Sequence, residues 1–506
     1  MINVSAAYKT AATARRRYPH IRVTVEWQTG VWTDESDNVI GFEVTRELFR
    51  LGAEMLPAST LDVGSLTLHN TDWRYSADYT GGDDTIRAHL SGVKGVTDKQ
   101  FRVDIGFTLA DTSIEYCRLF SGRLYRDNPN QDQALMVYQV RDALQDLLQR
   151  KVSTGLYTNK SHDELVALFA AAGQWTVDSD YLDPSPFRVP AAWLDDESAL
   201  TDLQAVAASA GGFIFSDAYG RLCFRLSSWL ADSASVFSFA AKDFQQMTPM
   251  RNPDNLATGV VVDYAPRIEG EASVVYEFNE AGKIIPPNSS VTLRARLDRP
   301  VKEVFDLVAD DDYWFLTPGG RPMNHKITIT KTTYAQAVDL TIANSHATLP
   351  ASLVFLRLRG TPIEGGPTGE RVRRLVGTEA ENSRVRSERG NAYVQTSNMA
   401  GLLLEMIADR VGVVEKAVRM TQAPGLPHLE LGDHVTVADP RDPSGVGHIG
   451  PILRMTSRWT QPQWGAPLRV PVFAQDFDVW TPGAPYVDTA LFYVGDTALG
   501  AAEAWY

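Results

Sequence analysis

Apolar and polar residues alternate along many segments of the first 140 residues, and this period of two constrains the fold more than any other feature. The segments are residues 21–27, 41–46, 61–68, 100–108, 115–125 and 134–140. Successive side chains of a β-strand point to opposite faces, so the alternation predicts antiparallel strands with one buried and one solvated face. Polar turn residues lie between them, as at 80–84 and 127–130. Such a run of strands is typical of a closed β-barrel or a β-sandwich.

Helical signals replace the alternation in the next part of the chain. Ser161 and Glu164 have the spacing of a capping box in front of LVALFAAAG, and Asp142 is expected to cap the short amphipathic helix ALQDLLQRK. The acidic pair Asp195–Asp196 stands before SALTDLQAVAASA, where a helix dipole would stabilise it. GFIFS and RLCFRL then flank the turn DAYG and predict a hairpin. Residues 142–230 are therefore expected to form a small α+β unit.

Strand patterns return from residue 256, interrupted by one amphipathic helix that opens at Thr396–Ser397. We expect a mainly β fold with α+β insertions, in which two antiparallel β-barrel domains are joined by a small helical and hairpin domain and a peripheral β domain. The expected boundaries are 1–141 for the first barrel domain, 142–235 for the α+β insert, 236–265 with 351–477 for the second barrel domain, 266–350 for the peripheral domain and 478–506 for an extended C-terminal arm.

The charge balance bears on the classes of partner. The net charge is −14, and the dense basic clusters are confined to residues 15–17 and 371–374. A specific nucleic-acid-binding protein normally carries a basic face, so tight DNA binding is not expected. The acidic balance is compatible with a surface that DNA slides past without adhering, because like charges repel.

The sequence shows neither a membrane-spanning segment nor a signal peptide, and this predicts the compartment in which the chain is made. No run approaches ~18 consecutive apolar residues, so no membrane-spanning segment is expected. The first 20 residues lack the apolar core of a signal peptide, and synthesis in the cytoplasm follows as the expectation. Cys117 and Cys223 lie in apolar strand patterns and are predicted to be buried, unreactive thiols.

Known catalytic and cofactor motifs are absent from the sequence. It contains no G-x-S-x-G, H-E-x-x-H, P-loop, G-x-G-x-x-G or C-x-x-C motif. The run 310–312 (Asp-Asp-Asp) lacks the alternating spacing of a calcium loop, and His428 and His434 have no third metal ligand beside them. We therefore expect no enzyme activity, no cofactor and no metal. Carboxylates that meet only in space could still hydrolyse a glycan, and aromatic residues could line a sugar cleft.

Four stretches, in this order, resemble the central hub proteins at the tail tip or baseplate of tailed bacteriophages. They are VGSLTLHNTDWRYS; LFSGRLYR with VYQVRDALQDLLQRKV; LTDLQAVAASAGGFIFSDAYGRLCFR; and NAYVQTSNMAGLLLEMIADRV with LPHLELGDHVTVADP. The residues of the first stretch that match the family pattern are Asn70, Asp72, Arg74, Tyr75 and Ser76. Trp73 stands where the family usually has Gly. The resemblance rests on the order and spacing of these stretches and extends over most of residues 20–475.

The resemblance implies a structural virion protein that forms a homotrimeric ring at the distal end of the tail tube. Each subunit of such a hub contributes two tube-like β-barrel domains, so three subunits present six similar faces to the hexameric tube. The ring nucleates tail assembly, and its lumen carries tape-measure protein and later genomic double-stranded DNA, which passes without specific binding. Further implied partners are the tail tube or distal tail protein and other tail-tip or fibre proteins.

Two alternatives from other functional classes stay open. One is a tail-associated hydrolase that cuts cell wall or capsule, and the other is a tail component that binds a receptor or carbohydrate.

The candidate site residues are expected to have structural roles. Asn70 and Asp72 are predicted to hydrogen-bond to their own backbone in a tight turn, and Arg74 to pair with a carboxylate or carbonyl. No catalytic, cofactor-binding or metal-binding residue is predicted. The full set of turn and interface candidates is Asn70, Asp72, Arg74, Tyr75, Gly122, Gly220, Gly432 and Asp433.

Overall fold

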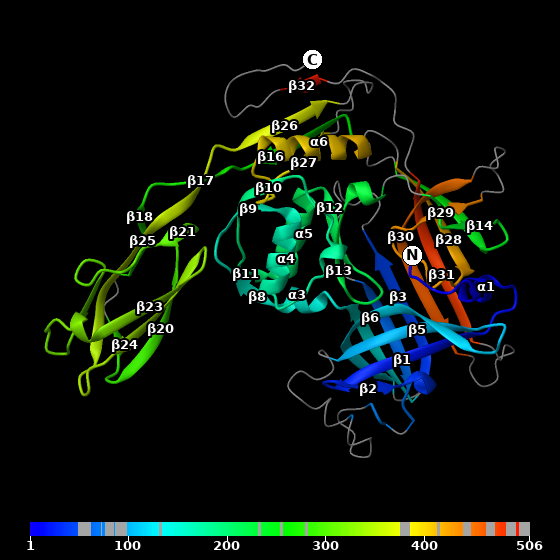
Figure 1. Cartoon of the computed structure of the whole chain (residues 1–506), viewed down its shortest axis with the longest axis horizontal. Helices are drawn as coiled ribbons and strands as arrows, with labels where there is room; N and C mark the ends of the chain where they lie inside the picture. Colours follow the sequence, from blue (N-terminus) through cyan, green and yellow to red (C-terminus); the bar gives the residue numbers. More distant parts are fainter. Residues whose placement is uncertain are drawn as a thin grey trace.

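The computed structural model describes the greater part of the chain, and β-strands dominate it (Figure 1). The described residues are 1–48, 62–71, 73–75, 86, 99–130, 134–230, 234–252, 257–278, 282–374, 385–411, 415–438, 447–461, 471–481 and 492–494. The expected mainly β fold with a small helical part is confirmed. None of the described helices has the length and apolar character needed to cross a lipid bilayer.

The largest element is a sheet of 13 strands that draws on both ends of the chain. Its N-terminal strands are β1 (Pro19–Gln28), β2 (Val31–Asp34), β3 (Val39–Glu47), β4 (Val63–His69), β5 (Gln100–Thr108), β6 (Ile114–Asn130) and β7 (Leu135–Asp142). Its C-terminal strands are β14 (Phe237–Phe239), β15 (Gln246–Asn252), β28 (Glu415–Pro424), β29 (His434–Val437), β30 (His448–Thr460) and β31 (Val472–Thr481). The strand order is β15-β28-β31-β30-β3-β4-β7-β6-β5-β1-β2, with β29 paired to β30 and β14 to β29.

The two sets of strands are joined where β3 meets β30. These strands pair antiparallel from Gly41 opposite Thr460 to Glu47 opposite Arg454. Each strand would otherwise leave backbone N–H and C=O groups unpaired at a sheet edge, and the pairing satisfies both edges at once. One hydrophobic core, which includes Phe42, Phe120, Met455 and Phe477, extends across the junction.

This sheet differs from the expectation of two closed barrels. Among the described strands, no pairing closes either half on itself, and the path ends at β2 on one side and β15 on the other. The halves share the β3–β30 ladder instead, so the strands that could close each half are used to join them. The short helix α1 (Ala6–Thr13), capped by Ser5, lies against β5, where the Tyr8 hydroxyl donates to the Ile105 carbonyl at 2.8 Å.

The α+β insert follows β7. It comprises α3 (Gln145–Gln149), β8 (Lys151–Ser153), β9 (Tyr157–Ser161), α4 (His162–Ala172), β10 (Arg188–Ala192), β11 (Asp195–Ser198), α5 (Ala199–Ser209), β12 (Gly212–Ser216) and β13 (Leu222–Leu226). The capping box of Ser161 and Glu164 is present at α4. Asp195 belongs to β11, which pairs with β8, so it does not lie in the first turn of α5 as expected.

A second core joins the insert to a later part of the chain. Here β16 (Gly259–Tyr264), β26 (Gly369–Arg374), β27 (Val385–Glu388) and β32 (Phe492–Val494) form a four-stranded sheet. The helix α6 (Ser397–Val411) covers it, and Met399, Leu403 and Ile407 pack in one cluster with Leu165 of α4 and Leu203 of α5. The sequence analysis grouped α6 and β16 with the second barrel domain, whereas their buried side chains pack with the insert.

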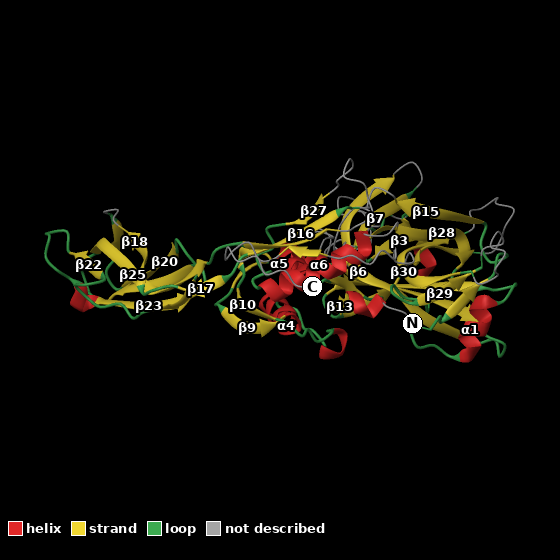
Figure 2. Cartoon of the chain, turned by 90° about the horizontal axis from the view of Figure 1, so that it is seen from above, coloured by secondary structure: helices red, strands yellow, loops and turns green. Residues whose placement is uncertain are grey.

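The peripheral unit has a core of its own and extends away from the rest of the molecule (Figures 1 and 2). Its strands are β17 (Arg267–Glu269), β18 (Ser273–Phe278), β19 (Lys283–Ile285), β20 (Ser289–Arg296), β21 (Val301–Val304), β22 (Tyr313–Leu316), β23 (Ile327–Thr333), β24 (Ala337–Asn344) and β25 (Ala351–Gly365). The long strand β25 is the partner of five shorter strands, and β20, β24 and β23 form a separate sheet. Short 3-10 helices complete the fold at Ser36–Asn38, Ser179–Tyr181, Ser227–Leu230 and Asn324–Lys326.

Candidate functional site

The stretch after β4 turns sharply, and Asn70 holds the turn. The Asn70 side chain is 1% exposed, and its Oδ1 accepts a hydrogen bond from the backbone N–H of Tyr75 at 3.0 Å. Its own N–H donates to the carbonyl of Ala134 at 2.7 Å, and the Trp73 N–H donates to the Asn70 carbonyl at 3.1 Å. A side chain that accepts from the backbone in this way replaces a backbone hydrogen bond that the turn cannot form. Asp72, the second predicted turn residue, lies outside the described residues.

Trp73 has a left-handed backbone with φ of +60°. This region is strained for residues with a Cβ and open to glycine. Trp73 stands where the resembled family usually has glycine. The chain adopts a turn suited to glycine with a tryptophan in place.

A buried carboxylate, Glu35, anchors the same turn. The Glu35 side chain is 0% exposed and accepts from the Tyr75 hydroxyl at 2.5 Å, from Arg74 Nη2 at 3.1 Å and from the Trp27 indole N–H at 2.8 Å. The Asn38 side chain donates to Glu35 Oε2, the oxygen that also accepts from Tyr75, at 3.0 Å. Charge-assisted bonds of this kind are stronger than neutral ones, so Glu35 ties the turn to strand β1. The arrangement suits a structural anchor, since both carboxylate oxygens are occupied by protein donors.

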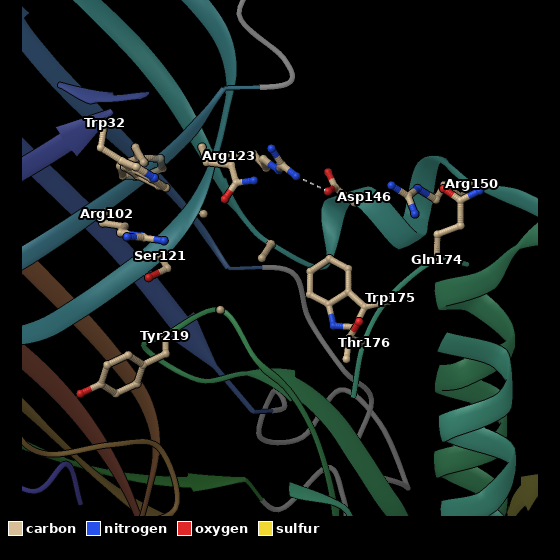
Figure 3. A pocket seen from close by; sticks show the side chains of 15 residues that line it. Trp32, Arg102, Ser121, Arg123, Asp146, Arg150, Gln174, Trp175, Thr176 and Tyr219 are labelled. Carbon is tan, nitrogen blue, oxygen red and sulfur yellow. Dashed lines mark hydrogen bonds and ion pairs between the residues drawn. The ribbon is translucent and has the colours of Figure 1, made fainter. Parts of the chain in front are cut away.

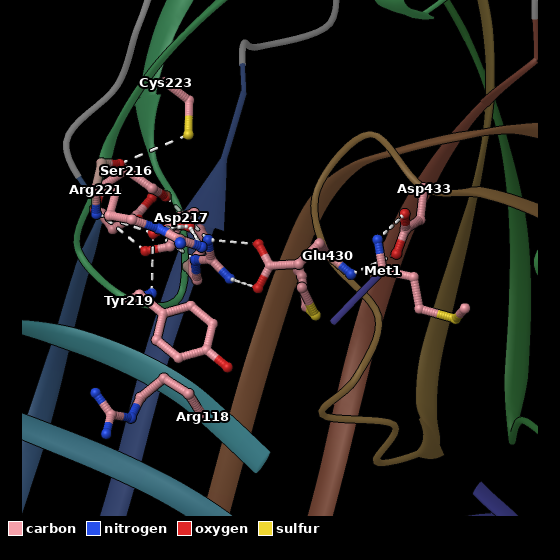
Figure 4. A network of polar contacts seen from close by, with 12 residues as sticks. Met1, Arg118, Ser216, Asp217, Tyr219, Arg221, Cys223, Glu430 and Asp433 are labelled. Atoms are coloured by element: carbon pink, nitrogen blue, oxygen red, sulfur yellow. Dashed lines mark hydrogen bonds and ion pairs between the residues drawn. The ribbon is translucent and has the colours of Figure 1, made fainter. Parts of the chain in front are cut away.

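A second polar cluster lies where the two halves of the large sheet meet the insert. Its centre is Arg46 on β3, which is 1% exposed. Arg46 donates two hydrogen bonds of 3.0 Å to Glu430, one of 3.3 Å to Asp62 and one of 2.9 Å to the carbonyl of Ser216. Glu430 belongs to the loop before β29, and Figure 4 shows it facing the hairpin that carries Ser216 and Asp217. One guanidinium thus connects both halves of the sheet and the β12–β13 hairpin. We call Arg46, Asp62, Asp142 and Glu430 the Arg46 cluster.

Asp142 completes the cluster from the end of β7. It is 0% exposed, and its carboxylate accepts from the backbone N–H groups of Asp62 at 3.1 Å and Leu144 at 3.0 Å. The expected helix-capping role is therefore wrong, because α3 starts only at Gln145 and Asp142 is still part of the strand.

Burial sets the proton affinity of the cluster. Loss of water raises the pKa of Asp142 to about 7, and it also raises the pKa of Asp62 and of Glu430, although Arg46 opposes each shift. Three carboxylates share one guanidinium in a buried place, and like charges disfavour full ionisation. The pKa of Asp142 therefore lies near neutral pH, and the pKa values of Asp62 and Glu430 lie above those of exposed carboxyls.

The remaining predicted residues lie at close approaches and turns. Gly432 has φ of +82°, and a Cβ there would overlap the Trp229 ring. Asp433 accepts from the Glu430 N–H at 2.8 Å and binds the Met1 ammonium (Figure 4). Gly220, with φ of +79°, lies in the β12–β13 turn, and a Cβ on Gly122 of β6 would meet the Arg141 carbonyl.

The structure places the described candidates in three locations, and Gly122 and Gly220 lie at one of them, where both line a cleft. It brings Gly432 and Asp433 next to Glu430 of the Arg46 cluster, whereas Asn70, Arg74 and Tyr75 form a separate corner around Glu35. The sequence analysis did not single out Glu35, Arg46, Asp62 or Glu430. A local signal did exist for Arg46, which follows Phe42 and Val44 at intervals of two on the buried face of β3.

Other residues considered in the sequence have structural partners. Asp312, in the acidic run, is buried and pairs with Arg359 at 2.8 Å and Arg357 at 3.3 Å. Cys117 and Cys223 are buried and free, as predicted, and burial raises the pKa of Cys223 to about 12. Burial also lowers the pKa of His428 to about 4, which keeps the ring neutral. Among the residues that the structure describes, no three metal-ligating side chains gather.

Comparison with known proteins gave matches among solved structures alone. No protein-family model and no curated protein matches the sequence. A 43 kDa tail protein of prophage MuSo2 from Shewanella oneidensis has 12% identity and a TM-score of 0.47, over 92% of this chain and 98% of that one. A tail protein of Neisseria meningitidis MC58 has 9% identity and a TM-score of 0.45, over 92% and 97%. Prophage tail protein gp18 of Listeria monocytogenes EGD-e has 8% identity and a TM-score of 0.40, over 92% and 95%. The solved structures to which this chain is similar therefore include phage tail proteins, the class that its sequence stretches resemble.

Proposed function

We propose that this chain is the structural hub of a phage tail tip or baseplate. In this proposal three copies form a ring that caps the hexameric tail tube, nucleates tail assembly and lines the channel for tape-measure protein and DNA. The role is that of a scaffold without enzyme activity, made in the host cytoplasm and carried in the virion.

The observation that carries the proposal is the junction of the two β-rich halves. Seven strands from the N-terminal part and six from the C-terminal part form one sheet through the β3–β30 ladder. The buried Arg46 cluster lies at this junction and fixes one half relative to the other. A threefold ring of such chains would contain six β-rich units, which is the number needed to meet a sixfold tube.

The charge of the chain supports a channel role. With a net charge of −14, a lumen lined by average surface of this protein would repel the phosphates of DNA. DNA could then pass without a specific protein–DNA contact to break.

The buried acids support a scaffold rather than a catalytic centre. The carboxylate oxygens of Glu35 and Asp312 bind donors within the protein, and both residues hold strands and turns together. A catalytic acid would need an oxygen directed at bound substrate.

Negative-stain imaging of the purified chain, alone and mixed with the tail tube protein of the same phage, tests the proposal. Rings with threefold symmetry, found at one end of the tubes in the mixture, are the expected result. Particles that stay single in both samples, or lysis of purified peptidoglycan by the chain, would count against a structural hub.

A further inference from the structure

A cleft of about 310 Å³ separates the large sheet from the helical insert (Figure 3). One wall consists of β5, β6 and the nearby Trp32 of β2. The other consists of α3, the segment after α4 and the β12–β13 turn. Its size lies at the lower end of the range for small-molecule sites. Of the candidates from the sequence, Gly122 and Gly220 line this cleft, and neither was assigned a ligand.

The cleft has more positive than negative charge. Arg102, Arg123 and Arg150 line it, with Asp146 as the acidic residue among the lining side chains. Arg123 pairs with Asp146 at 2.5 Å, and Arg150 donates to the carbonyl of Gly173. Two guanidinium charges therefore stay uncompensated by the lining, although the chain as a whole is strongly acidic.

Arg102 is the guanidinium best placed for a ligand. It lies over the Trp32 ring at 3.7 Å from the centroid, which holds the guanidinium flat. No ion pair to Arg102 occurs among the described residues. Burial and the nearby Arg118 lower the pKa of Arg102, while the carboxylates of Asp104 and Glu26 act in the opposite direction. A planar guanidinium of this kind matches the two oxygens of a carboxylate.

The rest of the lining favours a ring that carries many hydroxyl groups. Trp175 and Tyr219 contribute aromatic rings to the lining; Tyr219 is 47% exposed, and Arg221 and Arg118 lie over its ring at 4.7 and 5.7 Å from the centroid. C–H groups of a sugar ring can pack against the negative face of an aromatic ring. The amides of Gln100 and Gln174 and the hydroxyl of Thr176 also line the cleft, and each can form a hydrogen bond with a sugar hydroxyl.

Gln174 has an uncommon backbone for its residue type. It follows α4 with φ of +57°, a position that usually holds glycine or asparagine. Its N–H donates to the Ala171 carbonyl at 2.9 Å, so the helix end fixes the residue at the cleft. A long polar side chain at a strained position is compatible with a binding role.

We propose that this cleft binds a saccharide residue that bears a carboxylate, such as a uronic or sialic acid unit of a surface glycan. Arg102 pairs with the carboxylate, while Trp175 and Tyr219 flank the ring and the side-chain amides bond to its hydroxyls. A single-stranded nucleic acid also uses arginine and aromatic residues, but it needs a groove that follows several nucleotides. A compact cleft in an acidic protein fits one sugar unit better. The proposal does not require ring assembly.

Isothermal titration calorimetry of the full chain tests the proposal. The probes are glucuronic acid and N-acetylneuraminic acid, and glucose is the control without a carboxylate. Both acids are expected to bind and glucose is not. Arg102→Gln should weaken binding about tenfold or more, because a charge-assisted pair is lost. The affinity of Arg102→Lys should lie between those of the unchanged chain and Arg102→Gln. Arg16 is exposed and does not line the cleft, so Arg16→Gln should bind as the unchanged chain does. Circular dichroism and oligomeric mass of each variant confirm that it is folded.

Three outcomes would overturn the proposal. The first is that neither acid binds. The second is that glucose binds as tightly as the acids, or that Arg102→Gln binds the acids as tightly as the unchanged chain does. The third is tighter binding of inorganic phosphate, a thymidine oligonucleotide or polyglutamate, which would show a site for another class of anion.

Discussion

Arg46 and Glu430 lie 384 positions apart in the chain and form two parallel hydrogen bonds of 3.0 Å in the protein interior. Arg46 belongs to β3 of the N-terminal half, and Glu430 to the loop before β29 of the C-terminal half. The same guanidinium reaches Ser216 of the insert. The pair is therefore the point at which three separate parts of the chain are held in one arrangement.

Glu430→Gln should lower the free energy of unfolding by about 3–5 kcal/mol, because it leaves a buried guanidinium without its main partner. Urea unfolding followed by tryptophan fluorescence measures the change. The control is Glu269→Gln, which breaks the exposed pair with Lys302 and should cost about 1 kcal/mol or less. Equal losses for the two variants would show that the buried pair of Arg46 and Glu430 contributes no more to the free energy of unfolding than an exposed ion pair does.

The stability of the large sheet should fall as the pH rises from about 4 to about 8. Burial raises the pKa of Asp142 from 3.8 to about 7. The folded chain then holds a proton that the unfolded chain releases above about pH 4, so the contribution is fully present below that pH and is lost as the pH passes 7. Asp142→Asn should flatten this slope. Thermal unfolding across the pH range checks it, and an unchanged slope in the variant would exclude Asp142 as the source.

Asn70→Ala should destabilise the turn after β4 by about 1–3 kcal/mol, since the buried N–H of Tyr75 loses the acceptor that Asn70 supplies. Thr71→Ala, one position along and exposed, is the matched control and should stay within about 0.5 kcal/mol of the unchanged chain. Chemical unfolding compares the two. If Asn70→Ala kept full stability yet abolished glycan or host binding, the structural role of this turn would be refuted.

Two glycines with nearly the same φ allow the cost of backbone strain to be measured separately from the cost of a steric clash. Gly30 has φ of +81° and open space around it, whereas Gly432 has φ of +82° and faces the Trp229 ring. Gly30→Ala should cost about 1 kcal/mol, the cost of a left-handed backbone with a Cβ. Gly432→Ala should cost about 1–3 kcal/mol more, because the Trp229 ring, stacked on Phe215, must move. Thermal unfolding of both variants gives the difference, and equal costs would mean that the ring shifts freely.

Much of the fold could be predicted because its signals are local. The period-two segments became strands, the capping box of Ser161 and Glu164 started α4, and the turn DAYG joined β12 to β13. Pairing between the halves has no such signal. The edge strands β3 and β30 lie hundreds of residues apart, so the sequence was equally compatible with two closed barrels.

The candidate site could be predicted only in part, for a related reason. Asn70 and Arg74 stand in a recognisable turn, but the carboxylate that holds Arg74 lies on Glu35, before two intervening strands. Asp142 has the sequence context of a helix cap. Its phase with Tyr138 and Val140 on the buried face of β7 was the signal that it belongs to the interior. A charged residue that alternates in phase with the buried side chains of a strand thus indicates a buried polar cluster. The residues that pair with it can be identified only from the structure.

The oligomeric mass of the purified chain tests the hub proposal most directly. Light scattering after size-exclusion chromatography should give about 167 kDa, three times the 55.8 kDa of one chain, for the chain alone, or a larger complex that contains three chains after addition of tail tube protein. A folded chain that stays at 55.8 kDa under both conditions would contradict the account.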